Sequence, residues 1–420
     1  MHLWSSKFAT CCLLDSNGYA DPLGKFDAVL GAGMLSTVET AARGGWKALE
    51  DFRRNFSDWI FGHFSFEMKE TQYGVGTVHP DETGFPVMHF FRPEILLLLK
   101  GDTLRIGLPP GRPPGEAERL FGEISGFTPG LNEVSGQPET RTANWRLRVE
   151  KEAYLRSVEA IQRHLRKGDA YEVNFCTEHY ATDVLTDPLR LFRRLNELSP
   201  APFAALYRVN ECFVASSSPE RFLQKSGDRV ISQPMKGTIR RGNSIEEDAS
   251  LVDQLRSSAK ERSENIMAVD LVRNDLSRTT VPGSVTVTEL CGVYTFPQVH
   301  QLISTVTAKI RPGVSPESVL EAAFPMGSMT GAPKHRVLQL IDRYERSVRG
   351  IYSGALGYFT PEGDFDFNVV IRSVTGNRRR RTLSFQTGSG ITVYSDPARE
   401  WEECLLKGYA LEKAVMESLL

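Results

Sequence analysis

Four glutamates are spaced so that they could bind a metal ion in two pairs. Glu261 and Glu264 lie three residues apart in one stretch with a helical pattern, and Glu400 and Glu403 do so in another. Residues three apart share one face of a helix. Two such faces could converge on a hard cation such as Mg²⁺, which prefers oxygen ligands. The alternative is two solvated acidic faces, because most surface glutamates bind nothing.

A single lysine lies in a second candidate stretch, Ile231–Gly242. A strand-like run ends at Pro234, and Lys236 is followed directly by Gly237 and Thr238. A lysine beside a glycine lets an amine and a backbone approach a ligand together. The alternative is an ordinary surface turn with a solvated lysine.

A third candidate is the end of a strand-like run, Gln386–Ile391, which contains Gly388, Ser389 and Gly390. Glycines there permit a close approach of the backbone to a ligand carboxylate. A tight turn explains the same pattern without a ligand.

The composition is that of a globular protein, and the 420 residues suffice for two ordinary domains or one large one. A formal net charge of −2 gives no electrostatic case for nucleic acid or an anionic membrane. The run Arg378–Arg381 is interpreted as a solvated hairpin tip. The longest apolar run, Ile95–Leu99, is far too short to span a bilayer. Six cysteines without a C-x-x-C pair predict reduced thiols and a cytoplasmic location.

The elements that must position these residues are mostly hairpins and a few helices. Two apparent meanders, 170–235 and 352–393, predict antiparallel sheet. Helices are expected at 149–166, 246–272 and 333–345, and Asp396 followed by proline predicts another helix start. The Gly- and Pro-rich segment 109–141 is a candidate linker or surface excursion, with a short helix at 116–124. We therefore predict an N-terminal region, 1–140, packed on a catalytic region, 141–420.

Together these motifs resemble the chorismate-utilising enzymes. That family includes the large subunit of anthranilate synthase, aminodeoxychorismate synthase component I, isochorismate synthase and salicylate synthase. The resemblance covers residues 145–415 strongly, and Gly18–Asp27 and Phe61–Phe66 extend it weakly towards the N-terminus. It implies an α+β fold of two packed, mostly antiparallel β-sheets flanked by helices, with the site between them.

The resemblance also implies a role for each candidate residue. Glu264 and Glu403 resemble the magnesium-binding glutamates, and Glu261 and Glu400 resemble their companions. Glu220 resembles the general acid that protonates the departing 4-hydroxyl of chorismate, since hydroxide is a poor leaving group. Its local alternative is a surface glutamate beside Arg221. The residues that fall where the family holds chorismate are Gly237, Thr238, Tyr352, Arg372, Gly388, Ser389 and Gly390.

Two positions choose among the members of the family. Anthranilate synthases have alanine where this chain has Lys236, and a lysine there is similar to aminodeoxychorismate synthase. Isochorismate and salicylate synthases carry a water-activating lysine where this chain has Glu172.

The family often has a histidine at the position of Gln301. His300 is one residue away and would face the other side of a strand, so no catalytic histidine is assigned.

The function that the resemblance implies is the conversion of chorismate and ammonia to 4-amino-4-deoxychorismate, on the route to para-aminobenzoate and folate. No nucleophilic-cysteine motif of the G-x-C-x-G kind is present. Ammonia is therefore expected from a separate glutamine amidotransferase subunit. The alternatives are anthranilate synthase component I and a regulatory, non-catalytic relative that binds chorismate.

The implied mechanism uses Lys236 as a nucleophile that adds to C2 of chorismate. That step needs a neutral amine, whereas a free lysine has a pKa of about 10.4. Burial beside Mg²⁺ is expected to lower this pKa, because desolvation and a nearby cation both disfavour the ammonium form.

Overall fold

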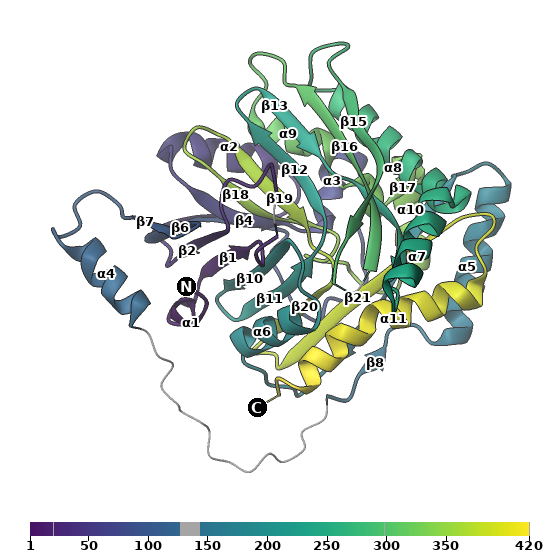
Figure 1. The fold of residues 1–420 in the computed structure, drawn as a ribbon, viewed down its shortest axis with the longest axis horizontal. Coiled ribbons are helices and arrows are strands. Elements are labelled where there is room, and N and C mark those ends of the chain that lie inside the picture. The colour runs from purple at the N-terminus through teal and green to yellow at the C-terminus, as the bar shows by residue number, and fades with distance from the viewer. Residues whose placement is uncertain (20, 127–142, 298, 420) are drawn as a thin grey trace.

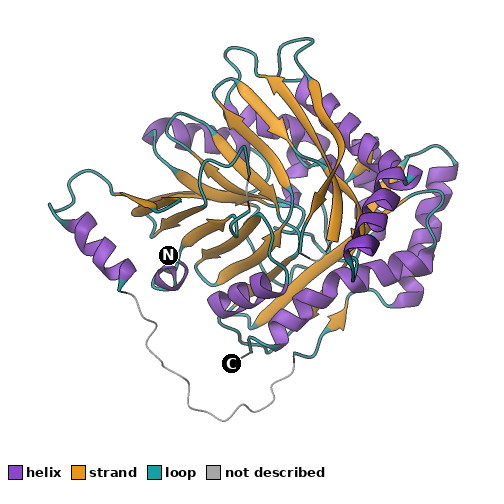
Figure 2. Ribbon diagram, in the orientation of Figure 1, coloured by secondary structure: helices purple, strands orange, loops and turns teal. Residues whose placement is uncertain are grey.

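The computed structural model describes residues 1–19, 21–126, 143–297 and 299–419. Within these ranges the chain forms two large sheets with helices on their outer sides (Figures 1 and 2). Every pairing between named strands is antiparallel, from β1·β10 to β8·β9. The predicted α+β class with two antiparallel sheets is confirmed.

The first sheet contains eleven strands within the described ranges, and β8 pairs with β9 beside the main order. In spatial order they are β17 (Gly331–Ala332), β9 (Glu172–Ala181), β21 (Thr382–Ile391), β20 (Ser373–Asn377), β11 (Cys212–Ser218), β10 (Phe203–Val209), β1 (Cys11–Asp15), β2 (Ala28–Ala32), β6 (Ile95–Lys100) and β7 (Thr103–Gly107), with β8 (Arg146–Leu147) outside that path.

The second sheet contains ten strands of the described chain, and β15 pairs with β16 beside the main order. In spatial order they are β14 (Met235–Arg240), β16 (Val299–Lys309), β13 (Arg229–Ser232), β12 (Arg221–Ser226), β19 (Phe365–Val369), β18 (Ala355–Phe359), β4 (Ile60–Phe64), β5 (Met88–Arg92) and β3 (Ser36–Thr40), with β15 (Thr286–Thr295) outside that path.

The two sheets pack face to face, and helices cover the outer face of each. Side chains from both sheets, such as Phe61 and Tyr207, form one apolar cluster between them. The helices are α1 (His2–Ser5), α2 (Gly45–Phe56), α3 (Lys69–Tyr73), α4 (Glu116–Ser125), α5 (Lys151–Arg166), α6 (Pro188–Leu198), α7 (Ile245–Ser257), α8 (Ala259–Ser277), α9 (Pro316–Ala323), α10 (Lys334–Tyr344) and α11 (Pro397–Met416).

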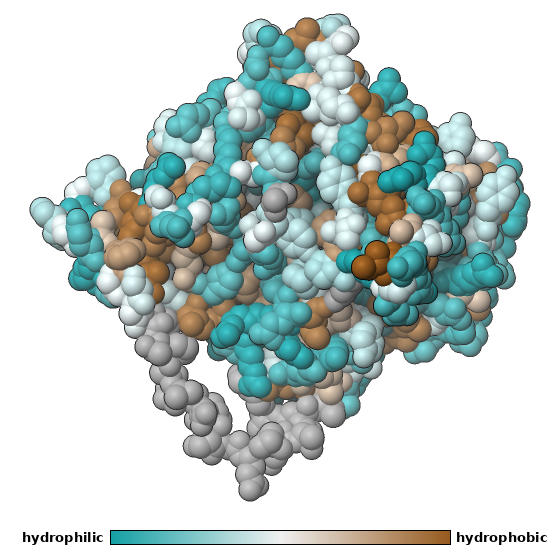
Figure 3. All heavy atoms as spheres, viewed as in Figure 1, coloured by the Kyte–Doolittle hydropathy of each residue, from teal (hydrophilic) through white to brown (hydrophobic). Residues whose placement is uncertain are grey.

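The two outer cores use different helices. Helices α2, α8 and α9 pack on the second sheet, and α6 and α11 pack on the first. In Figure 1 the yellow α11 runs along the lower right of the molecule, beside β21. None of the helices in the described ranges is long and apolar enough to cross a membrane. The face drawn in Figure 3 is mainly hydrophilic, with smaller hydrophobic patches between.

Strands from the first hundred residues belong to both sheets. β1 pairs with β10 in the first sheet, where Leu13 lies opposite Leu206. β4 pairs with β18 in the second, where Gly62 lies opposite Gly357. The boundary between residues 140 and 141 and the second part of the candidate linker, residues 127–141, lie outside the described residues, so the division into two regions stays a prediction. The short helix expected at 116–124 is present as α4.

The expected meanders need a correction, because each is shared between the two sheets. β10 and β11 belong to the first sheet, whereas the next two strands, β12 and β13, belong to the second. Likewise β18 and β19 lie in the second sheet, and β20 and β21 lie in the first. Within these two stretches the chain therefore crosses between the sheets twice: the first crossing follows Ser218 and the second follows Val369.

The helix expected at 246–272 also needs a correction, because it is two helices. α7 ends at Ser257, and Ser258 caps the N-terminus of α8 by accepting a hydrogen bond from the backbone N–H of Glu261. The sequence itself contains a signal for this second helix start, because a serine followed three residues later by glutamate is a capping box. The other helix starts are close to those expected, and Asp396 caps α11 as predicted.

Candidate active site

Lys236 lies in a bulge near the start of β14. The pairing of β14 with β16 shifts between Met235 and Thr238, so Lys236 and Gly237 fall outside the regular ladder. A bulge redirects a side chain without breaking the strand. Gly237 has φ +89°, and a Cβ there would lie 3.0–3.1 Å from the side chain of Glu261. Glycine is therefore required here for two reasons. Its backbone is in the left-handed region, and α8 comes too close to leave room for a side chain. Thr238 resumes the pairing and is exposed.

The side chain of Lys236 reaches across to the first sheet. Its Nζ donates a hydrogen bond of 2.7 Å to Oε1 of Glu172, the first residue of β9. The two side chains are 13% and 5% exposed. Burial by itself lowers the pKa of Lys236, but the carboxylates of Glu172 and Glu264 outweigh burial and hold that pKa above its ordinary value. The acidic neighbours of the amine thus reverse the effect of burial, and the lowering of this pKa expected beside Mg²⁺ stays a prediction.

Glu220 lies at the first crossing between the sheets, just before β12. Its side chain is buried, and burial raises its pKa to about 7, with the charge of Lys236 acting in the opposite direction. The adjacent Arg221 pairs with Asp366 and Asp21 and not with Glu220. A surface glutamate beside Arg221 is thus excluded. At neutral pH a large fraction of Glu220 is protonated, as a proton donor requires.

Arg372 lies at the second crossing, just before β20. Its φ of +51° is in the left-handed region, which is unusual for a residue with a side chain and is a form of backbone strain that gathers at functional sites. Within the described chain no hydrogen bond or ion pair is seen for its guanidinium. Burial lowers the pKa of Arg372, while Tyr352 and Glu403 act to raise it. An unpaired, desolvated guanidinium beside this cluster suits a substrate carboxylate.

The two crossings lie against one another. The backbone N–H of Val369 donates to the carbonyl of Glu220 at 3.0 Å, and the N–H of Ser217 donates to the carbonyl of Arg372 at 3.1 Å. β11 pairs with β20 on one side of the crossings, and β12 pairs with β19 on the other. One antiparallel ribbon therefore passes from the first sheet to the second and carries both residues at its bend.

Tyr352 is buried and lies within electrostatic reach of Arg372. Its hydroxyl lies 3.7 Å from Sγ of Cys176, and burial raises its pKa well above the ordinary value. The phenol is therefore neutral and able to act as a hydrogen-bond donor, which is what a carboxylate ligand needs.

The glycines at the end of β21 make room for the Lys236–Glu172 pair. A Cβ at Gly390 would lie 2.2 Å from Oε1 of Glu172 and 3.1 Å from Nζ of Lys236. A Cβ at Gly388 would lie 2.5 Å from Sγ of Cys176. Ser389 is buried, with its hydroxyl 3.4 Å from that of Tyr154, so its side chain belongs to the core and only its backbone is available to a ligand.

Glu261 and Glu264 lie on α8, and Glu400 and Glu403 lie on α11. The two helices bring all four side chains within electrostatic reach of Lys260. Burial raises the pKa of Glu264 to about 7; Lys236 opposes this, and the negative charges of Glu172 and Glu261 add to it.

Glu400 is buried, whereas Glu403 is half-exposed and bonds to Lys407 at 2.5 Å. Burial raises the pKa of Glu403, but Lys407 outweighs burial and lowers it overall. The fold thus brings together acidic side chains that repel one another, and nearby lysines partly offset this repulsion.

These four glutamates suit a hard cation, because each would bind it through a carboxylate oxygen. Across the described ranges no group of three or more His, Cys, Asp or Glu side chains already has the spacing of a metal site. Magnesium needs only one or two direct carboxylates and keeps several waters, so one glutamate from each helix would suffice. The magnesium site stays a prediction.

Sequence reasoning missed Asn265, which fixes α8 against the second sheet. It is fully buried, and its amide donates to the carbonyls of Lys236 at 3.3 Å and of Leu302 at 3.2 Å. Its Oδ1 accepts a hydrogen bond from Ser304. A polar residue on the face of a helix that packs on a sheet is a usable signal, because buried amides are retained where they are hydrogen-bonded.

Both ring nitrogens of His300 contact residues outside the candidate site. Its Nε2 is 2.9 Å from Oδ1 of Asp248, and its Nδ1 is 2.9 Å from the hydroxyl of Thr295. The imidazole is therefore occupied by its structural partners.

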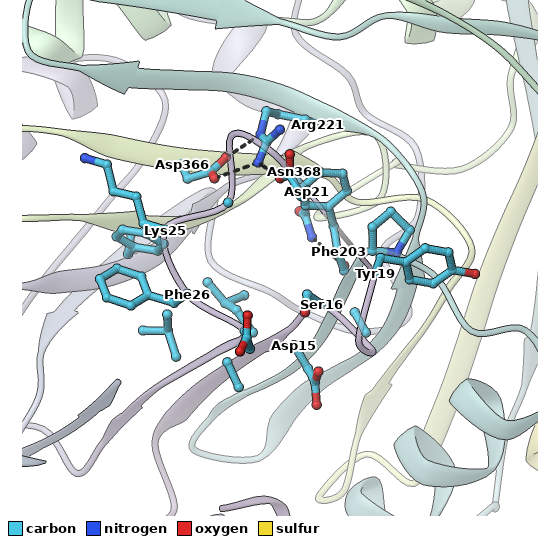
Figure 4. A pocket seen from close by; sticks show the side chains of 18 of the residues that line it. Asp15, Ser16, Tyr19, Asp21, Lys25, Phe26, Phe203, Arg221, Asp366 and Asn368 are labelled. Carbon is cyan, nitrogen blue, oxygen red and sulfur yellow. Dashed lines mark hydrogen bonds and ion pairs between the residues drawn. The ribbon is translucent and has the colours of Figure 1, made fainter. Parts of the chain in front are cut away.

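A separate cavity of about 80 Å³ is lined by the N-terminal segment and by residues of β10, β12 and β19 (Figure 4). Figure 4 shows Arg221 bonded to Asp366 at its rim, with Asp21 and Tyr19 from the N-terminal segment beside it. None of the candidate site residues lines this cavity. It is distinct from the cluster around Lys236.

Comparison with known sequences shows where this arrangement belongs. The sequence profile described as "chorismate binding enzyme" matches residues 19–413, nearly the whole chain. The chain is a member of the chorismate-binding enzyme family. The resemblance inferred from the motifs is thereby confirmed.

Relatives within the family carry two different names. The aminodeoxychorismate synthase of Streptomyces griseus is 44% identical over 65% of this chain and 38% of its own length. Aminodeoxychorismate synthase component 1 of Klebsiella aerogenes is 41% identical over 63% of this chain and 58% of its own length. Anthranilate synthase component 1 of Thermus thermophilus is 33% identical over 86% of this chain and 78% of its own length. The match thus spans 38% and 58% of the length of the two aminodeoxychorismate synthases, less than two thirds of each.

Solved structures of the family share the fold. Anthranilate synthase component I of Streptococcus pneumoniae superposes with a TM-score of 0.80 at 23% identity, covering 94% of this chain and 93% of that one. The menaquinone-specific isochorismate synthase of Escherichia coli superposes with a TM-score of 0.77 at 16% identity, covering 99% and 91%. At these identities the likeness concerns the fold alone.

Proposed function

We propose that this chain is an aminodeoxychorismate synthase component 1, which converts chorismate and ammonia to 4-amino-4-deoxychorismate. The observation that carries the proposal is that a buried lysine amine, Lys236, lies within electrostatic reach of a buried carboxyl that is partly protonated at neutral pH, Glu220. A nucleophile and a proton donor are the two groups that displacement of a hydroxyl requires. The identities of about 40% to proteins of that name support it.

In this proposal Lys236 adds at C2 of chorismate while Glu220 protonates the departing 4-hydroxyl. Ammonia then adds at C4 and expels the lysine, and Glu220 regains a proton from the new amine. Splitting one difficult displacement into two easier ones is what a covalent nucleophile contributes. Arg372, Tyr352 and the backbone at Gly237 and Gly390 would hold the two carboxylates of the substrate.

Magnesium would be held by Glu264 and Glu403, with Glu261 and Glu400 beside them. Bound there, the ion would neutralise a substrate carboxylate. The residues of the chain do the rest: Lys236 attacks, Glu220 transfers the proton and Arg372 orients the ring.

Ammonia would come from a glutamine amidotransferase partner in this proposal. All six cysteines of the chain are buried, and burial raises the pKa of five of them, among them Cys176 and Cys212. A thiol that hydrolyses an amide must be accessible and readily ionised. We therefore expect the purified chain to use ammonium and not glutamine. Glutamine-dependent turnover by the chain alone would contradict this.

Six free thiols also fit the reducing cytoplasm proposed for it.

The main alternative is anthranilate synthase component I, which the Thermus relative favours because it matches more of the chain. Lys236 argues against it, since the family has alanine there in anthranilate synthases. The deciding experiment supplies chorismate, Mg²⁺ and ammonium and separates the products after treatment with a lyase. para-Aminobenzoate supports the proposal, and anthranilate supports the alternative. If chorismate binds but is not turned over, the chain is a regulatory relative.

A further inference from the structure

Lys236 and Glu172 join the two sheets at the candidate active site. Lys236 comes from β14 of the second sheet and Glu172 from β9 of the first, and their hydrogen bond of 2.7 Å is almost completely buried. Over the described residues, Glu172 is the only partner that hydrogen-bonds to the Lys236 amine. Glu264 and Glu220 act on the amine electrostatically, from farther away. A proton leaving this amine inside the closed site thus has one bonded acceptor.

The chain is built to keep this pair together. The absent side chain of Gly390 leaves the space that the carboxylate and the amine occupy, because a Cβ would collide with Glu172. Asn265 fixes the backbone carbonyl of Lys236 from the side of α8. The backbone of Glu172 is held by pairing with Ala332 of β17. Both partners are therefore anchored in the backbone, so the short contact between them is imposed by the fold.

We propose that Glu172 accepts a proton from Lys236 when the lysine attacks the substrate and returns it when the lysine is released. This inference rests on the proposed function, in which Lys236 forms a covalent adduct. It answers a difficulty that the site itself poses: the amine must be neutral to attack, yet its surroundings favour the ammonium form. An acceptor in direct contact allows the proton to move without leaving the site.

The remaining carboxyls are already engaged. Glu220 must hold its proton for the departing hydroxyl, so it cannot also take one from Lys236 in the same step. Glu264 lies on α8 among the groups proposed to bind magnesium. Glu172 is left as the carboxyl whose only bonded side-chain partner, among the residues that the structure describes, is the lysine.

Protons and electrons balance over the cycle. The pair begins as ammonium and carboxylate; the proton moves to Glu172, and the nitrogen lone pair of Lys236 forms the bond to C2. The C4–O bond breaks, and Glu220 gives its proton to form water. Ammonia then forms the bond to C4, the bond from C2 to lysine breaks, and the new C4 ammonium returns a proton to Glu220. The released amine takes its proton back from Glu172, so both carboxyls end as they began.

The test is the pH dependence of adduct formation with chorismate and Mg²⁺ in the absence of ammonia, followed by mass spectrometry of Lys236. Transfer within the pair leaves the number of bound protons unchanged. The wild-type rate should therefore be flat from about pH 5.5 up to the pKa of Glu220 near 7. In Glu172→Gln the amine must lose its proton to solvent, so the rate should rise by about tenfold per pH unit over the same range.

Three further variants make the result specific. Glu172→Asp keeps a carboxylate and should keep the flat profile at a lower rate. Glu172→Ala should be rescued by added formate, which supplies a carboxylate; it also decides the question if Glu172→Gln does not fold. Glu178→Gln is the matched control, because Glu178 is a buried glutamate on the same strand that bonds to Arg148 and Ser384 instead. Its profile should be that of the wild type.

The outcomes separate this inference from the proposed function. A flat profile for Glu172→Gln, or a folded Glu172→Ala that formate does not accelerate, overturns the role of Glu172 while the wild-type adduct still supports the proposed function. A wild-type chain that aminates chorismate without any adduct at Lys236 overturns the covalent step and the role of Glu172 with it. A wild-type chain that forms neither adduct nor product contradicts the proposed function itself.

Discussion

The amide of Asn265 donates a hydrogen bond to the backbone carbonyl of Lys236, so the helix with two of the candidate metal ligands is fixed directly to the strand that carries the candidate nucleophile. Glu264 immediately precedes Asn265 on that helix. The geometry between the amine and the candidate metal ligands thus rests in part on one buried side chain that has no role in the proposed chemistry.

We expect Asn265→Ala to lower both stability and activity. It leaves the carbonyl groups of Lys236 and Leu302 and the hydroxyl of Ser304 without this partner, and each unsatisfied buried group costs about 1–3 kcal/mol. Thermal unfolding and kcat/KM measure the two effects. Asn274→Ala, an exposed asparagine on the same helix, should change stability by no more than about 0.5 kcal/mol. Equal effects of both variants would refute the argument.

The magnesium prediction concerns Glu264→Gln and Glu403→Gln, which keep the size of the side chain but remove its charge. Each should lower activity by about 100-fold or more, recovered only in part by excess Mg²⁺, because the ion stabilises charge by several kcal/mol. Titration of activity and of Mg²⁺ binding measures this. Glu402→Gln is the control, since Glu402 is an exposed neighbour of Glu403. Full activity of the wild type after exhaustive chelation would rule out the metal.

Arg372→Gln should weaken chorismate binding and leave stability nearly unchanged, because no described residue pairs with this guanidinium. Loss of one partner of a buried charge pair costs about 2–5 kcal/mol, so KM should rise by about 30-fold or more. Substrate titration and thermal unfolding separate the two effects. Arg379→Gln, at the exposed hairpin tip, should leave KM unaltered. A large loss of stability with an unchanged KM would make Arg372 a structural residue.

Glu220 should also make the stability depend on pH. Its pKa is raised from 4.5 to about 7 in the folded chain, so between these values the folded state holds a proton that the unfolded state has lost. Stability therefore falls as pH rises through this window, by about 3 kcal/mol in total for this group. Glu220→Gln removes this contribution. Urea unfolding at pH 5 and pH 7.5 should thus show a smaller loss for the variant than for the wild type.

The same protonation should appear in the activity. Wild-type kcat/KM should decline above about pH 7 as Glu220 loses the proton that it must donate. Glu220→Gln cannot donate a proton to the hydroxyl and should lose about 100-fold or more at every pH. A variant that retains the wild-type pH profile would exclude Glu220 as the acid.

Much of the local structure could be predicted from the sequence. The spacing of apolar residues predicts the helix at 151–166 to within two residues, and Asp396 followed by proline predicts the start of α11. The passage of the chain from one sheet to the other at Glu220 could not be predicted this way. Alternation shows which face of a strand is buried, and it contains no information about which sheet the strand joins.

The site shows a similar limit. The candidate residues could be chosen from motif spacing, and the structure brings Lys236, Glu220 and Glu264 within electrostatic reach of one another. The charge state of Lys236 could not be predicted, because it depends on Glu172, which precedes it by 64 residues in the chain and meets it only across the two sheets. Burial alone would have lowered the pKa, and the partners reverse that direction.

The bent ribbon that carries Glu220 and Arg372 has a consequence for how the protein folds. The ribbon pairs Ser216 with Ser373 and Arg221 with Asn368, so its two strands are separated by more than a hundred residues of chain. Contacts between such distant segments form late, since the loop between them must first be closed. An intermediate with only one sheet in place would contain only one of the two candidate residues, Glu220 or Arg372. Recovery of activity during refolding should therefore coincide with the last cooperative step, after most secondary structure has returned.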